Sequence, residues 1–208
     1  MLRKPMTGYP ASGARFRGVL RWCTAIVTGL ALLLCGGRAA GQQSGPTEYQ
    51  VKAAFLLNFA KFIDWPESSF ASPQAPFSIC ILGADPFGPE IDETLHGQTL
   101  DGRGVIVQRL RDATGLRRCQ VGFISASEKS HLADIFQAVR GANVLLVGES
   151  PGFASAGGAI QFQLRDNRVR FSINPEAAER AGLRVSSKLL SLATIAHDTG
   201  GDGKGGGL

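Results

Sequence analysis

Side chains that could carry out catalysis are few and scattered along the chain. Ser155 sits in the segment GFASAG, but Phe153 occupies the position where a G-x-S-x-G nucleophile elbow needs glycine. The G-x-G-x-x-G pattern in GDGKGG, residues 201–206, follows no predicted strand and opens no predicted helix. Three histidines lie far apart and lack neighbours at metal-ligand spacing: His96, His131 and His197. We therefore predict no enzyme activity, no metal and no cofactor.

Two cysteines lie beyond the N-terminal segment, Cys80 in FSICILG and Cys119 in CQVGFIS. Both stand in or beside apolar stretches, which suits a structural role better than a reactive thiolate. If the domain is exported, a disulfide between them is reasonable. The alternative is two buried free thiols. A Cys–His nucleophile is not excluded by spacing alone.

Polar side chains cluster in one late segment of the chain. Arg165, Arg168 and Arg170, with Asn167, either form an anion site or make up a solvated strand face. A ligand pocket at the carboxyl ends of parallel strands is a second place for polar contacts, near residues 83–85, 125–127 or 149–152. The candidate polar binding residues are Asp85, Arg168, Arg170 and Asn174.

The charge of the chain is unevenly distributed. The whole sequence of 208 residues has a formal charge of +5, but residues 1–40 carry six basic residues and no acidic one. The remainder has 16 basic and 17 acidic residues, so it lacks the basic surplus of a nucleic-acid-binding protein. We expect no nucleic-acid partner.

The N-terminal 40 residues have the layout of a secretory signal peptide. A basic region ends at Arg21, the apolar run CTAIVTGLALLLC covers residues 23–35, and small residues follow. The run is shorter than the roughly 20 residues that span a bilayer. We expect cleavage near Ala39 or Ala40. The chain then divides into a signal peptide (1–40), a linker (41–46), one domain (47–197) and a disordered Gly-rich tail (198–208).

The domain alternates strands and helices, which predicts an α/β fold with a mostly parallel sheet and flanking helices. Strands are expected at residues 77–83, 102–110, 119–126 and 143–150. Helices are expected at 86–96 with Asp85 as cap, at 127–140 opened by Ser127, and at 186–196. Residues 159–174 predict a β-hairpin that turns at 165–167, with Leu164 on its polar face, and Pro175 opens a further helix.

The segment VKAAFLLNFAKFIDWP, residues 51–66, is unusually aromatic. Thr47 and Gln50 fit a capping box, so a helix is predicted from Glu48 to Ile63 that stops before Trp65-Pro66. Its apolar face is wider than one sheet easily buries. We expect most of it to be core and a minority to form a partner or dimer surface, assigned to these residues: Leu56, Phe59, Ile63 and Trp65.

The order of the motifs closely resembles the YfiR family of exported bacterial proteins. The matching blocks span roughly residues 48–196 and are VKAAFLLNFAKFIDWP, FSICILGADPFG, CQVGFIS, VLLVGESPGFASAGGAIQF and NRVRFSINPEAAERAGLRVSSKLLSLA. The resemblance implies a periplasmic α/β domain that dimerises. Cys80 and Cys119 match family cysteine positions, which implies a disulfide. A second disulfide of some members has no counterpart here.

The resemblance also implies a function. Its best-known members bind the periplasmic sensor part of an inner-membrane diguanylate cyclase and hold it inactive, until an outer-membrane-associated lipoprotein sequesters the repressor. Cyclic di-GMP then rises and favours biofilm. The implied reading is a regulatory binding protein that acts by contact. The alternatives are a periplasmic small-ligand binding protein and an accessory of another membrane sensor such as a histidine kinase.

Overall fold

Strand β2 (Phe77–Leu82) is buried at every position and lies inside an eight-stranded sheet of order β10-β8-β7-β6-β5-β2-β4-β3. The computed structural model describes residues 45–199, and the predicted signal peptide, most of the linker and residues 200–208 lie outside this range. The other strands of the sheet are β3 (Thr99–Leu100), β4 (Arg103–Leu110), β5 (Val121–Ile124), β6 (Leu145–Gly148), β7 (Ile160–Arg165), β8 (Arg168–Ile173) and β10 (Thr194–Ile195).

The sheet is mostly parallel, as predicted from alternating strands and helices. Strands β4, β2, β5, β6 and β7 run parallel to one another, whereas β8 returns antiparallel to β7. Strand β10 pairs parallel to β8, and β3 pairs antiparallel to β4. A separate antiparallel pair joins β1 (Ile63–Asp64) to β9 (Arg184–Val185). The predicted α/β fold class is therefore confirmed.

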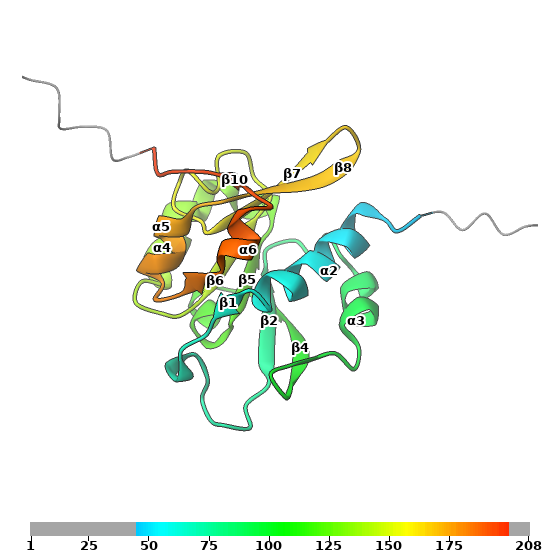
Figure 1. The fold of residues 1–208 in the computed structure, drawn as a ribbon, viewed down its shortest axis with the longest axis vertical. Coiled ribbons are helices and arrows are strands. Elements are labelled where there is room, and N and C mark those ends of the chain that lie inside the picture. Colours follow the sequence, from blue (N-terminus) through cyan, green and yellow to red (C-terminus); the bar gives the residue numbers. More distant parts are fainter. Residues whose placement is uncertain (1–44, 200–208) are drawn as a thin grey trace, which may run out of the picture. The chain divides into compact units, whose positions relative to one another are not determined.

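Helices cover both faces of the sheet (Figure 1). One face packs against α2 (Glu48–Ala60), α3 (Pro89–Leu95), α5 (Pro175–Arg180) and α6 (Ser187–Leu190). The other face packs against α4 (Leu132–Ala138) and the 3₁₀ helix η2 (Ala113–Arg118). Two further 3₁₀ helices are η1 (Glu67–Ser69) and η3 (Ala126–His131). Burial on both faces explains why β2 and β5 are nearly all apolar.

Helix α2 begins as predicted but ends earlier. The Thr47 hydroxyl accepts from the N–H of Gln50, and the Gln50 amide oxygen accepts from the N–H of Thr47, which completes the capping box. The helix ends at Ala60 rather than Ile63, because the Trp65 indole donates to the Ala60 carbonyl over 2.9 Å and Ile63 pairs with β9. The predicted end at Ile63 was wrong because this distant pairing overrides the local helical pattern.

The Asp85 cap was also placed incorrectly. The Asp85 carboxylate accepts from the N–H groups of Phe87 and Gly88, so it closes a turn before the helix. The N-cap of α3 is Gly88 with φ 54°, a conformation that glycine adopts without strain. Pro89 then opens the helix, three residues later than predicted.

Two later helices are shorter than predicted. The segment opened by Ser127 is the 3₁₀ helix η3, capped instead by Ser125, and only Leu132–Ala138 is α-helical. The helix predicted at 186–196 ends at Leu190, and Thr194 and Ile195 pair with Ser172 and Ile173 of β8. β-branched residues favour such pairing over a helical continuation.

The predicted hairpin is present and forms β7 and β8. Asp166 and Asn167 occupy its turn with φ values of 50° and 57°, as a two-residue type I′ turn requires. In this register Leu164 lies opposite Val169, on the apolar face. The assignment of Leu164 to the polar face is therefore wrong. Figure 1 shows the hairpin projecting beyond the end of the sheet.

Candidate functional site

Cys80 and Cys119 form a disulfide with a Cα–Cα distance of 6.1 Å. Cys80 lies on β2, and Cys119 follows η2 shortly before β5. Both side chains are buried in the core that faces α4. The bond therefore ties the end of a crossover to strand β2, and neither sulfur is available as a nucleophile.

The aromatic helix is core along its whole inner face. Leu56 and Phe59 are 0% exposed, and Ile63 is buried as well. The Phe59 ring packs on those of Phe162 and Phe171, with centroid distances of 5.5 Å and 4.9 Å. The prediction of a partner or dimer surface on Leu56, Phe59 and Ile63 was therefore wrong, because the hairpin strands supply enough aromatic surface to cover the helix.

Trp65 differs from the other three residues assigned to a partner surface. It is half-buried, and its ring packs edge-on against Phe77 at 5.3 Å. The rest of the side chain lines a cavity of about 700 Å³ together with Phe70 and Arg103. The guanidinium of Arg103 stacks over the Phe70 ring at 3.9 Å. Trp65 thus keeps a surface that another molecule can reach.

The four candidate polar residues do not form one site. The Asp85 carboxylate accepts from Arg109 over 2.8 Å, and Arg109 also binds Asp92. The hydrogen bond from Arg109 holds the pKa of the Asp92 carboxyl below its usual value. Asp85 and its partners therefore fasten α3 to β4.

Asn174 is fully buried and acts within the fold. Its amide nitrogen donates to the Ala154 carbonyl over 2.8 Å and to the Asp198 carboxylate over 2.7 Å. Its amide oxygen accepts from the N–H of Ala177 and caps α5. Asp198 also binds Arg180, so the chain is still held at the point where a disordered tail was predicted to begin.

Arg168 and Arg170 remain exposed on the hairpin. Strand alternation places them on the same face as Arg165, which lies directly opposite Arg168. No ion pair joins these three arginines to a carboxylate within residues 45–199. The three positive charges therefore face solvent at the sheet edge.

A buried charged cluster at the carboxyl end of β6 was missed from the sequence. The ammonium of Lys52 is 2.7 Å from the carboxylate of Glu149 and also binds Glu48. Burial alone lowers the pKa of Lys52, but the bonds to Glu149 and Glu48 outweigh it and raise that pKa. Burial first, and then Glu149, raises the pKa of the Tyr49 phenol. The i,i+4 spacing of Glu48 and Lys52 was the available signal.

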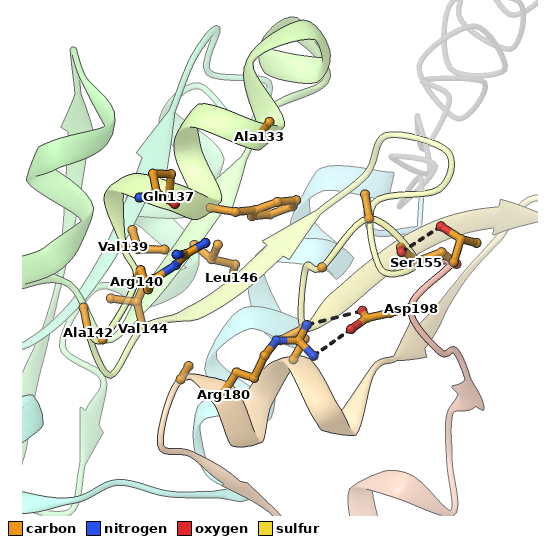
Figure 2. A pocket seen from close by; sticks show the side chains of 18 residues that line it. Ala133, Gln137, Val139, Arg140, Ala142, Val144, Leu146, Ser155, Arg180 and Asp198 are labelled. Atoms are coloured by element: carbon orange, nitrogen blue, oxygen red, sulfur yellow. Dashed lines mark hydrogen bonds and ion pairs between the residues drawn. The ribbon is translucent and has the colours of Figure 1, made fainter. Parts of the chain in front are cut away.

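A cavity of about 700 Å³ lies between α4 and α5, beside β6 (Figure 2). Its apolar wall includes Phe136, Val144 and Leu146, and Figure 2 shows Arg180 bonded to Asp198 on the opposite side. A ligand pocket was predicted near residues 83–85, 125–127 or 149–152. None of these residues lines this cavity, so it is a different site.

Ser155 lines this cavity but has no base beside it. Its carbonyl, not its hydroxyl, accepts from Thr199, and no histidine or carboxylate of the described chain bonds to its side chain. His197 binds Glu176 at 3.0 Å instead. Within residues 45–199 no group of three metal-binding side chains forms, and no helix is long and apolar enough to cross a membrane.

One comparison with known proteins bears on these observations. A family model described as YfiR/HmsC-like matches residues 49–194, which is most of the chain and nearly all of its described part. The match includes the aromatic helix, both disulfide cysteines and the arginine-bearing hairpin.

Proposed function

The chain belongs to the YfiR/HmsC-like family, and we propose that it is a periplasmic protein that represses an inner-membrane diguanylate cyclase by direct contact. The single observation that carries this proposal is the family match over residues 49–194, because the family is known for periplasmic repressors of these cyclases. The family is regulatory rather than catalytic.

Two features of the fold support this function. The Cys80–Cys119 disulfide suits an oxidising compartment such as the periplasm. The domain also leaves apolar side chains within reach of a protein partner, since Leu164, Leu192 and Ile195 are exposed and Trp65 is half-buried. In the proposed mechanism the repressor binds the periplasmic sensor part of the cyclase and stabilises its inactive state.

Release from repression needs a second binding event. We infer an outer-membrane-associated lipoprotein that competes for the repressor, and a homodimer as the form that binds. Sequestration then lowers the concentration of free repressor, and the cyclase becomes active by mass action. A histidine kinase in place of the cyclase would keep this mechanism and change the pathway.

Capture of the partner in living cells tests the proposal. The tagged chain is expressed at native level in its host, cross-linked in the periplasm, and the captured proteins are identified by mass spectrometry. Capture of an inner-membrane protein with a periplasmic sensor and a cyclase domain is the expected result. Capture of this chain alone, at levels where a control pair cross-links, rejects the proposal.

The cavity between α4 and α5 supports a second candidate function, small-ligand binding. Apolar groups form one wall, and Arg140 brings positive charge to the lining, whereas the charge of Arg180 is balanced by Asp198. A small anion with an apolar body matches this lining. Screening such compounds for an increase in the melting temperature of the mature domain tests this candidate, with Leu146→Trp as the variant that fills the cavity.

A further inference from the structure

The outer edge of β8 is only partly covered. Strand β7 pairs with all six residues of β8, but β10 pairs only with Ser172 and Ile173. The Ile173 carbonyl accepts from the N–H of Ala196 over 2.8 Å, so its backbone groups point toward β10. Because these groups alternate in direction along a strand, those of Phe171 and Val169 point the same way. The parallel pairing of Thr194 with Ser172 also uses the carbonyl of Phe171. Within residues 45–199 this leaves the N–H of Phe171 and both backbone groups of Val169 without a partner strand.

The two faces beside this edge have different chemistry. On the side of α2 lie apolar residues, of which Leu164 is 53% exposed and Phe171 is half-buried. On the opposite side lie the exposed arginines Arg165, Arg168 and Arg170. Asp166 in the turn is the one acidic residue of the hairpin.

The charges on the hairpin select its occupant. A second copy that paired through the same edge would bring its own three arginines against these three, and like charges on neighbouring strands are destabilising. An acidic segment in the same position gains binding energy, because its carboxylates form strong charge-assisted hydrogen bonds to the arginines. Positive charge on an edge strand guards against pairing with neutral strands. It therefore favours an acidic strand over other extended chains.

We propose that the edge of β8 at Val169–Phe171 binds an extended segment of the partner by strand addition. Such a strand bonds to the N–H and the carbonyl of Val169 and to the N–H of Phe171. Its alternate side chains reach the two faces, so the segment alternates acidic residues, placed against Arg168 and Arg170, with apolar ones, placed toward Leu164. This inference rests on the proposed function, because the segment belongs to the periplasmic part of the membrane protein that the chain represses.

A proline at Val169 tests the backbone part of this proposal. Val169→Pro removes an N–H that points to the open edge and leaves the β7 bonds of Arg168 and Arg170 in place. Val169→Thr, which keeps the N–H and a β-branched side chain, is the matched control. A benzophenone cross-linker replaces Leu164, and the same cross-linker at Ile106, on strand β4 at the far side of the sheet, is the positional control.

Charge reversal tests the side-chain part without changing the backbone. Arg168→Glu combined with Arg170→Glu is compared with Arg111→Glu combined with Arg118→Glu, two exposed arginines near the other side of the sheet. We expect each hairpin variant, but neither control variant, to lower the yield of partner cross-links about tenfold or more. Equal melting temperatures of the variants and the wild type show that folding is unchanged.

The outcomes separate this inference from the proposed function. Capture of an acidic partner segment through Leu164, lost in both hairpin variants, supports strand addition. Capture of a cyclase that neither hairpin variant weakens overturns strand addition and leaves repression by contact intact. Capture of only a second copy through Leu164 overturns the choice of occupant. If no membrane protein is captured from either position by the wild type, the inference falls together with the proposed function.

Discussion

The ammonium of Lys52 lies 2.7 Å from Oε2 of Glu149, a contact that joins helix α2 to the carboxyl end of strand β6. Lys52 is 4% exposed, and its charge is also balanced by Glu48 in the preceding helical turn. The Tyr49 ring lies 4.5 Å from the same ammonium and its hydroxyl faces Glu149. One buried cation thus holds the start of the aromatic helix against the sheet.

Removing this cation should destabilise the domain. Lys52→Met leaves the Glu149 carboxylate largely buried without its partner, so we expect the free energy of unfolding to fall by about 3 kcal/mol. Lys61→Met, at an exposed position just after the same helix, should change it by less than about 0.5 kcal/mol. Urea unfolding followed by circular dichroism measures both. Equal effects of the two substitutions would show that the buried pair adds nothing.

The contribution of Lys52 should depend on pH only in the alkaline range. Its pKa is raised on folding, so its stabilising effect is fully present below the unfolded value of about 10.4 and is lost as pH rises through the folded pKa. The Tyr49 pKa is also raised, so that phenol stays neutral at pH 7. We expect the stability difference between wild type and Lys52→Met to be constant from pH 7 to 9 and to shrink above about 10.4. A difference that already declines by pH 8 contradicts this assignment.

The interior of α2 should not tolerate charge. Leu56→Asp places a carboxylate in a fully buried site among apolar side chains, and we expect it to unfold the domain. Leu56→Ala should lower the free energy of unfolding by about 2–5 kcal/mol. Asn58→Asp, at an exposed position of the same helix, is the control and should remain folded. A folded, soluble Leu56→Asp protein would mean that Leu56 lies at the surface and not in the core.

The disulfide should contribute a large part of the stability. Cys80 and Cys119 are 39 residues apart, and closing a loop of that size stabilises a small domain by about 2–4 kcal/mol. We expect the Cys80→Ala, Cys119→Ala double variant to show this loss in urea unfolding. A reducing agent should destabilise the wild type and leave the double variant unchanged. A wild type whose stability the reducing agent leaves unchanged would mean that the two sulfurs are not joined.

The Phe153 ring should make two glycines irreplaceable. It packs so closely on Gly148 and Gly158 that a Cβ at either position would overlap it. Gly158→Ala should therefore cost about 1–3 kcal/mol in stability. Gly104→Ala on β4 is the control, because a Cβ there meets no atom within 4 Å. If both substitutions are neutral, the ring has room to move.

Local signals in the sequence predicted the parts of the fold that local physics determines. The Thr47–Gln50 capping box and the largely apolar run of β2 needed only neighbouring residues, and both are present. The end of α2 depended instead on pairing with β9, more than a hundred residues away. The last strand, β10, likewise formed where the local pattern predicted a helix. Such distant pairings are not visible in a local pattern.

The candidate site was harder to predict for the same reason. The apolar helix face that includes Leu56 and Phe59 was expected to be too wide for one sheet to bury. Phe162 and Phe171 of the hairpin extend the aromatic surface that covers it. Lys52 looked like a break in the apolar face, because nothing in its neighbourhood indicated Glu149 as a buried partner. The hairpin arginines were identified from the sequence. The open edge beside them could not be, because it depends on β10 pairing with only two residues of β8.

The most direct test of the account is the cyclic di-GMP content of the native host after deletion of the gene. Repression of a diguanylate cyclase predicts that the content rises on deletion and returns to its original level when the full chain is supplied from a plasmid. A secretion-defective version that lacks residues 1–40 should fail to restore it, because the proposed contact lies in the periplasm. A content that does not change on deletion would mean that the chain does not repress a diguanylate cyclase in this host.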